Sequence, residues 1–217
     1  MITHLDRLDR PLEGKADVGG PDHPMRKVTR QVAFEPQGWT ADRRAEVGEL
    51  FSGLAPDWRS RIEPGRHDAL RDALARGFEG FDRSPLTCAE VGSGTGDSTP
   101  ILAEWIGPDA RLASFDLALP MLALADAAIA PRVQADASTM PLGDGSVDLV
   151  VLVNMLLFPA EVARVLRADG RLLWVNTSGD RTPIHLPADD VAAALPGTWS
   201  GVASAAGQGT WCVMCRT

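Results

Sequence analysis

Short apolar runs and helical patterns alternate along most of this chain. Apolar residues recur at helical spacing in segments that lie between apolar runs or flank them: 40–54, 67–78, the residues after 96, 120–128, 161–167 and 187–195. The apolar runs have the length of single strands and lie at 86–91, 111–115, 131–135, 147–153 and 171–176. The run 147–153 is nearly all apolar, which is typical of a central strand covered on both faces. This alternation predicts an α/β fold with a mostly parallel sheet and helices on both faces.

The two ends of the chain differ from this repeating middle. Residues 1–38 hold many prolines, glycines and charges, which predicts a flexible arm. We expect one domain over 39–217, with cap helices in 39–84 and the sheet core in 85–217. Two further strands between 199 and 216 predict an antiparallel hairpin.

Three glycines alternate directly after the first predicted strand, at Gly92, Gly94 and Gly96. A strand, a glycine turn and a helix bring backbone close to a ligand at the carboxyl end of a parallel sheet. In the nicotinamide-dinucleotide pattern G-x-G-x-x-G the third glycine comes one residue later, so that alternative is disfavoured. Asp116 and Asp136 end the next two predicted strands. Acids at successive strand ends indicate a nucleoside-like ligand across the sheet edge.

In these motifs the chain resembles the class I S-adenosylmethionine-dependent methyltransferases that act on small molecules. The resemblance covers roughly 50–175 and rests on four motifs in order, which lie in 90–96, 115–122, 136–150 and 161–174. It implies a Rossmann-like, seven-stranded, mostly parallel sheet with an antiparallel C-terminal edge strand. It also implies S-adenosylmethionine as cofactor, in-line transfer of a methyl group to a small-molecule acceptor, and no metal.

The resemblance places cofactor binding in the glycine loop and at the strand ends: Glu90, Gly92, Ser93, Gly94, Thr95, Gly96, Asp116, Leu117, Met121, Asp136, Ala137, Asn154 and Met155. Asp116 corresponds to the acid that accepts both ribose hydroxyls, and Asp136 with Ala137 corresponds to the adenine contact. Leu117 and Met121 would flank the ring, whereas Glu90 would act indirectly. As structural alternatives, Asp116 caps a helix, Asp136 belongs to a turn, and Asn154 stabilises a turn.

The acceptor side is less defined. Trp58, His67 and His185 are the expected substrate-side residues, and His185 is the candidate general base because an imidazole can accept a proton near neutral pH. Core packing is the alternative for Trp58. The helical segment that usually follows the fourth strand is cut short after Phe158, which keeps open a non-catalytic module that binds S-adenosylmethionine.

Charge and cysteine content limit the binding partners and the cellular compartment that we expect. The 217 residues carry a net charge of −8, which argues against a nucleic-acid surface and weakly against anionic membranes. No apolar run is long enough to span a membrane, and residues 1–30 do not form a secretory signal, so we expect a cytoplasmic protein. Cys212 and Cys215 form a C-x-x-C in a predicted strand, where they would face opposite sides, so a structural role is favoured over zinc. The oligomeric state stays open.

Overall fold

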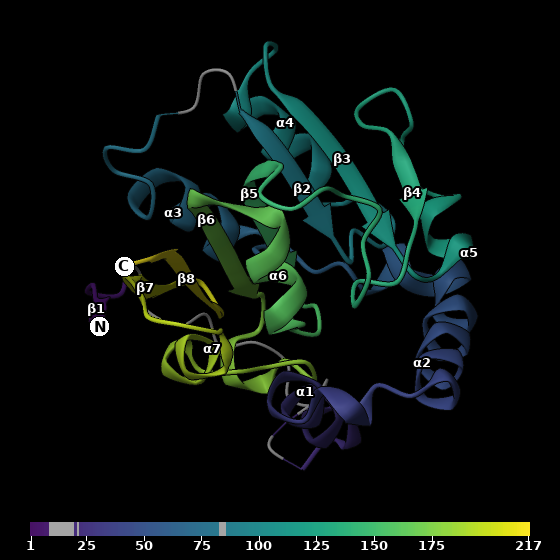
Figure 1. Cartoon of the computed structure of the whole chain (residues 1–217). Coiled ribbons are helices and arrows are strands. Elements are labelled where there is room, and N and C mark those ends of the chain that lie inside the picture. The colour runs from purple at the N-terminus through teal and green to yellow at the C-terminus, as the bar shows by residue number, and fades with distance from the viewer. Residues whose placement is uncertain (9–19, 21, 83–85) are drawn as a thin grey trace.

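The computed structural model describes residues 1–8, 20, 22–82 and 86–217. One mixed sheet of eight strands forms its centre, in the order β1-β7-β8-β6-β5-β2-β3-β4 (Figure 1). All strands run in one direction except β8, which is antiparallel to both neighbours. The strands are β1 Ile2–His4, β2 Thr87–Val91, β3 Arg111–Asp116, β4 Arg132–Gln134, β5 Val147–Val153, β6 Leu166–Asn176, β7 Trp199–Ala206 and β8 Gly209–Arg216.

The fold class predicted from the sequence is confirmed, with one strand more than expected. The extra strand, β1, pairs in parallel with β7 at the edge of the sheet, and antiparallel β8 lies between β7 and β6. An unpaired strand edge presents free N–H and C=O groups, and β1 satisfies those of β7.

The expected flexible arm is wrong at both of its described ends. Residues 2–4 form β1, and residues 24–34 form helix α1, which begins with Pro24 and is capped by the His23 ring accepting the Met25 N–H. Helix α1 is held because it buries an apolar stripe that includes Met25 and Val32. Residues 9–19 and 21 lie outside the described part.

The helices after residue 38 follow the predicted positions closely, except at one element, whereas α1 lies in the segment that was predicted to be a flexible arm. They are α1 Pro24–Phe34, α2 Ala41–Leu54, α3 Asp68–Arg76, α4 Thr99–Ile106, α5 Leu119–Leu122, α6 Pro159–Val165 and α7 Ala188–Ala194. Short 3-10 turns lie at Pro36–Gly38, Ala55–Arg61 and Gly179–Arg181. The helix predicted over 120–128 shrinks to α5, because the Asp126 carboxylate accepts the N–H of Ala128 in a local turn. Arg132 then donates to the carbonyls of Leu122 and Ala125.

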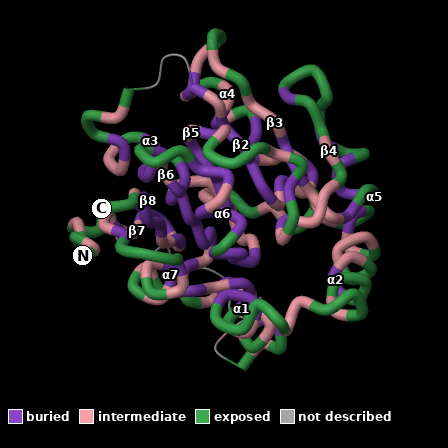
Figure 2. Tube along the Cα trace, viewed as in Figure 1, coloured by how far each residue is buried: buried purple, intermediate pink, exposed green. Residues whose placement is uncertain are grey.

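The core has two layers, one on each face of the sheet. Val150 and Leu152 of β5 face the layer that contains residues of α1, α2, α6 and α7. Their neighbours Leu149 and Val151 face the layer that contains residues of α3 and α4. Successive side chains of a strand point to opposite faces, so β5 is buried on both sides, as its composition predicts (Figure 2).

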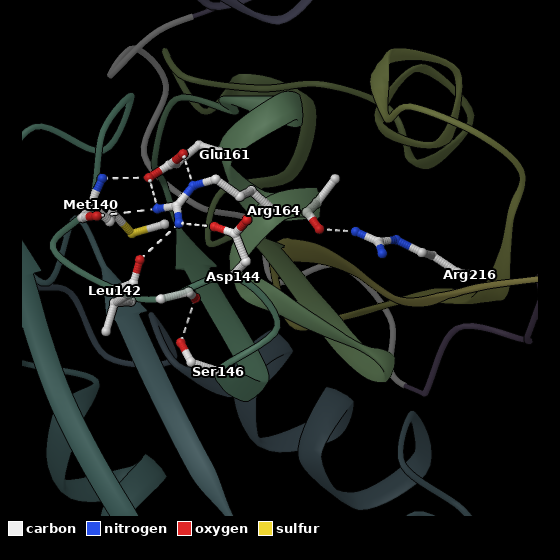
Figure 3. A network of polar contacts seen from close by, with 9 residues as sticks. Met140, Leu142, Asp144, Ser146, Glu161, Arg164 and Arg216 are labelled. Carbon is white, nitrogen blue, oxygen red and sulfur yellow. Dashed lines mark hydrogen bonds and ion pairs between the residues drawn. The ribbon is translucent and has the colours of Figure 1, made fainter.

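An arginine on α6 fixes the connection between β4 and β5. Arg164 forms a two-point ion pair with Glu161 at 2.6 and 2.8 Å, and it donates to the carbonyls of Met140 and Leu142 and to Asp144 (Figure 3). Glu161 in turn accepts the Met140 N–H. The loop that follows Asp136 is therefore tied to α6, which limits its freedom at the carboxyl edge of the sheet.

Candidate functional site

A cavity lies where the carboxyl ends of β2, β3, β4 and β5 meet. Most of the predicted site residues line it: Trp58, His67, Gly92, Ser93, Gly94, Asp116, Leu117, Met121, Asp136, Ala137, Asn154 and Met155. Four predicted residues do not, namely Glu90, Thr95, Gly96 and His185. The carboxyl ends of parallel strands lie at one edge of the sheet. Motifs that each follow a strand are therefore brought to the same edge, which explains why most of the predicted site residues line one cavity.

The glycine loop turns tightly at the end of β2 and leaves open space in front of it. The N–H groups of Gly92 and Ser93 both donate to the Phe115 carbonyl, at 2.8 and 3.0 Å. Gly92 has a φ of 72°, and a Cβ there would lie 2.4 Å from the Met155 sulfur. Gly94 has a φ of 56°, and a Cβ there would meet no atom within 4 Å. The loop therefore needs glycine for its backbone and has room for a ligand at Gly94.

Glu90 supports this loop from behind. Its side chain is 1% exposed and accepts hydrogen bonds from the hydroxyls of Ser98 at 2.6 Å, Thr99 at 2.6 Å and Ser114 at 2.9 Å. Burial raises the pKa of the Glu90 carboxyl, and the three hydroxyls oppose that shift. Glu90 thus ties the start of α4 to β3 and does not line the cavity.

Thr95 and Gly96 also shape the loop without lining the cavity. The Thr95 hydroxyl donates to Asp97 at 2.9 Å. Gly96 has a φ of 76°, and a Cβ there would lie 2.9 Å from the Ala125 methyl group. These two positions serve the conformation and packing of the loop.

Asp116 joins the glycine loop to the segment after β3. One carboxylate oxygen accepts the Gly94 N–H and the other accepts the Ala118 N–H, each at 2.8 Å. Burial raises the pKa of Asp116, while hydrogen bonds from backbone N–H groups lower it. A carboxylate offers about four acceptor positions, so Asp116 can cap the next turn and still accept hydroxyl donors from a ligand.

Asp136 meets two side chains that the sequence did not suggest. The Trp39 indole N–H donates to it at 3.1 Å, and Arg44 pairs with it at 3.2 Å. It also accepts the Ser138 N–H at 2.8 Å, which supports the turn interpretation. Burial acts to raise the pKa of Asp136, but the hydrogen bonds from Ser138, Arg44 and Trp39 prevail and lower it. Asp136 is therefore held ionised and oriented.

Asn154 has an unusual backbone. Its φ is 51°, a positive value for a residue other than glycine. Its side-chain amide donates to the Thr177 hydroxyl and its oxygen accepts the Thr177 N–H, both at 2.8 Å. These bonds support the stabilising role and turn the chain so that Asn154 and Met155 line the cavity.

Aromatic side chains form much of the remaining wall. Trp39 lies edge-on to Phe158 with ring centroids 5.0 Å apart, and Phe51 lies edge-on to Trp58 at 6.2 Å. All four line the cavity. Of these, Trp39, Phe51 and Phe158 were absent from the predicted site, because single aromatic residues in a helix or loop look like ordinary core positions.

A charged group lies at another part of the wall. The Arg66 guanidinium lies over the Trp58 ring at 5.8 Å, and His67 and Asp97 line the same cavity. Burial, and then the charge of Arg66, lower the pKa of His67, so its imidazole is neutral at neutral pH. Arg66 and Asp97 are further residues that sequence reasoning missed.

His185 is turned away from the cavity, whereas its neighbour Ile184 lines it. The Arg26 guanidinium donates to the His185 ring Nδ1 at 3.0 Å. Burial and the Arg26 charge lower the pKa of His185 to about 4. The structure therefore gives no geometric basis for His185 as a general base acting in the cavity.

Among the described residues, the remaining chemical motifs form no metal-binding centre. Within the described residues, no group of three or more His, Cys, Asp or Glu side chains could hold a metal ion. Cys212 is buried and Cys215 is half-buried, and both belong to β8. No helix in the described part is long and apolar enough to cross a membrane.

Known proteins resemble this chain in sequence. A family model described as a methyltransferase domain matches residues 89–174. A demethylmenaquinone methyltransferase of Mycobacterium sp. (strain JLS) is 30% identical over 176 residues, which are 73% of this chain and 72% of that protein. A demethylmenaquinone methyltransferase of Lactococcus lactis subsp. lactis (strain IL1403) is 27% identical, over 64% of this chain and 61% of that protein. This chain therefore matches less than two thirds of the Lactococcus protein.

Solved structures share the fold at lower identity. A SAM-dependent methyltransferase from Aquifex aeolicus superposes with a TM-score of 0.59 at 17% identity, covering 74% of this chain and 96% of that one. The [4+2]-cyclase SpnF superposes with a TM-score of 0.53 at 19% identity, covering 69% of each chain. The second likeness illustrates that one fold can carry different reactions.

Proposed function

From the premise that this chain belongs to the class I S-adenosylmethionine-dependent methyltransferases, we propose that it moves a methyl group to a small, largely apolar acceptor. S-adenosylmethionine is the cofactor of this family. The family assignment replaces the nicotinamide-dependent alternative, and methyltransferase relatives favour an enzyme over a non-catalytic binding module. Cytoplasmic residence and the single domain over 39–217 stay predictions.

The residues present suit the cofactor. The Ser93 hydroxyl is buried and has no hydrogen-bond partner among the described residues, and the space in front of Gly94 is open. A buried hydroxyl without a partner is costly, so a polar ligand group at the glycine loop would relieve it. We propose that Asp116 accepts the ribose hydroxyls and that Asp136, with Ala137, contacts the adenine edge. Leu117 and Met121 supply apolar surface for the ring.

The protein's part in the reaction is mainly to bind and position. When bound, the cofactor supplies a methyl group already activated by a positive sulfur. Holding an acceptor in line with that group contributes several kcal/mol through orientation alone. The Asn154 backbone turn and the Met155 side chain would fix the edge of the cofactor site, and the aromatic wall would exclude water. A covalent protein intermediate is not required.

The observation that carries the acceptor class is the aromatic wall of Trp39, Phe51, Trp58 and Phe158. Flat aromatic faces suit a planar apolar ring, through stacking and edge contacts. The relatives' names add a more specific candidate, because both curated relatives above are demethylmenaquinone methyltransferases. We propose an aromatic or quinone-type ring as acceptor. Trp58 and His67 stay proposed substrate-side residues.

Calorimetric titration with S-adenosylhomocysteine, the product form of the cofactor, tests the cofactor site. We expect micromolar binding to the wild type and a loss of at least tenfold in Asp116→Ala, since ribose acceptors would be removed. The exposed Asp109→Ala is the matched control and should bind normally. NADH should not bind. Absence of S-adenosylhomocysteine binding to the wild type would contradict the proposal.

Methyl transfer itself needs a separate assay. Incubation with S-adenosylmethionine and a short-chain demethylmenaquinone in its reduced form should give a product heavier by one methylene, detected by mass spectrometry. A polar control acceptor of similar size, such as a catechol sulfonate, should react far less. Equal transfer to both acceptors would contradict the apolar acceptor class.

A further inference from the structure

Trp39 connects two parts of the cavity that serve different ligands in the proposed reaction. Its indole N–H lies 3.1 and 3.3 Å from the two carboxylate oxygens of Asp136 and donates to that carboxylate. Its ring lies edge-on to Phe158, with the ring centroids 5.0 Å apart, and both rings line the cavity. One side chain therefore contacts the acid proposed for the adenine edge and belongs to the aromatic wall proposed for the acceptor.

The contacts at Asp136 also hold the start of α2. Trp39 lies two residues before this helix begins, and Arg44, near its start, pairs with the same carboxylate at 3.2 Å. Further along α2, Val47 and Phe51 line the cavity. Two side chains from one short segment thus fix this part of the cavity wall against the loop that follows β4.

The strength of the Trp39 hydrogen bond depends on how much water reaches Asp136. The Asp136 side chain is 12% exposed, so water can compete for its oxygens. A hydrogen bond to a charged group becomes stronger when water is excluded and the local dielectric constant falls. A purine ring against Asp136 would displace that water, and the indole of Trp39 would then be held more firmly.

We propose that Trp39 is a positioning residue for the acceptor, and that it couples acceptor binding to cofactor binding through its hydrogen bond to Asp136. This inference rests on the proposed function, because it assumes that adenine lies at Asp136 and the acceptor at the aromatic wall. A second ligand that meets a wall already ordered by the first loses less conformational entropy on binding. Each ligand should therefore raise the affinity for the other by the same factor.

Calorimetry with two ligands measures this coupling directly. The probe for the acceptor site is 1-naphthol, and S-adenosylhomocysteine fills the cofactor site without supplying a methyl group. We expect the wild type to bind 1-naphthol roughly fivefold more tightly at saturating S-adenosylhomocysteine than without it, as for one ordinary hydrogen bond. Trp39→Phe keeps an aromatic ring but lacks the N–H, so this difference should disappear. Its affinity for S-adenosylhomocysteine alone should stay close to that of the wild type.

Trp105→Phe on α4 is the matched control. The Trp105 indole N–H donates to the Leu74 carbonyl at 3.0 Å, and this residue does not line the cavity. The same substitution therefore removes an indole hydrogen bond elsewhere in the fold and should leave the coupling intact.

Steady-state kinetics give a second readout that a merely structural role would not produce. With short-chain reduced demethylmenaquinone as acceptor, Trp39→Phe should raise the KM for the acceptor roughly fivefold, for loss of the same hydrogen bond. The KM for S-adenosylmethionine should change little. By NMR, S-adenosylhomocysteine should slow the exchange of the Trp39 indole proton with water, and that signal is assigned by its loss in Trp39→Phe.

Several outcomes would overturn the inference while the proposed function stands. They are coupling in Trp39→Phe equal to that of the wild type, binding of both ligands to the wild type without coupling, and a change of both KM values by the same factor. Loss of coupling in Trp105→Phe as well would assign the effect to general stability and would also overturn it. If the wild type binds no S-adenosylhomocysteine, the proposed function itself fails.

Discussion

Replacing Glu90 tests the link between the buried carboxylate and the glycine loop. In Glu90→Ala, the hydroxyls of Ser98, Thr99 and Ser114 lose their acceptor in a region where each is 6% exposed or less. An unsatisfied buried hydroxyl costs about 1–3 kcal/mol. Three such losses, partly offset by removal of a buried charge, give an expected destabilisation of about 3–5 kcal/mol.

Glu90→Gln is the informative companion because it keeps shape and one acceptor oxygen. One Glu90 oxygen accepts both Thr99 and Ser114, and the other accepts only Ser98. A glutamine oxygen can accept the first two, and the Ser98 hydroxyl can rotate to accept from the amide. We expect a cost of about 1 kcal/mol.

Urea unfolding, followed by far-UV circular dichroism, gives the free energy of unfolding of both variants. An unchanged slope of this free energy against urea concentration is the check for two-state behaviour. S-adenosylhomocysteine affinity should fall in the order wild type, Glu90→Gln, Glu90→Ala, because Ser98 and Thr99 begin the helix after the loop. If Glu90→Ala unfolds within 1 kcal/mol of wild type, or if both variants lose the same stability, the three hydrogen bonds do not hold the loop as described.

The pH dependence of this difference has a definite sign. Burial raises the folded-state pKa of Glu90 above its value of 4.5 in an unfolded chain. The charged form is therefore destabilising above the folded pKa, and the wild type regains stability as pH falls through that pKa. The stability of wild type relative to Glu90→Gln should rise on acidification and level off below about pH 4.5. A difference that falls on acidification would refute the assignment.

Three further outcomes follow from the site. Trp39→Phe keeps an aromatic ring but removes the N–H that donates to Asp136, so we expect the free energy of unfolding in urea to fall by about 1 kcal/mol. An unchanged free energy of unfolding would show that this hydrogen bond does not contribute to stability. Asn154→Gly should lower the free energy of unfolding by about 1 kcal/mol less than Asn154→Ala does. Both variants lose the same hydrogen bonds to Thr177, but only glycine tolerates the positive φ without strain. Equal stabilities of the two variants would exclude backbone strain at this position. NMR titration should show His185 neutral from pH 5 to 8, since its pKa is about 4. Arg26→Met should raise that pKa because it removes a nearby cation. An unchanged pKa in this variant would leave burial as the sole cause of the lowered pKa.

Much of the site was readable from local sequence because local rules determine it. Gly92 and Gly94 follow a strand, and Asp116 and Asp136 end the next two, so topology alone brings them to one edge. The burial of β5 on both faces likewise follows from its apolar composition. These features depend on which residues form each strand and which residues follow it, and both are encoded by neighbouring residues.

The structural alternatives were partly correct for the same residues. Asp116 and Asp136 each accept a backbone N–H two residues later, as turn-forming acids do, while also lining the cavity. A carboxylate has enough acceptor positions for both roles, so the two interpretations were never exclusive.

Tertiary structure alone decided the contacts between distant segments and the directions of single side chains. Trp39 reaches Asp136 across 97 residues, and nothing in either neighbourhood indicates that pairing. Ile184 lines the cavity while adjacent His185 turns to Arg26, a choice set by packing between α1 and the segment after β6. The sequence by itself determined which strands are followed by cofactor-site candidates. The packing of the N-terminal helices determined which further side chains line the cavity, because that packing depends on the summed burial of residues far apart in the chain.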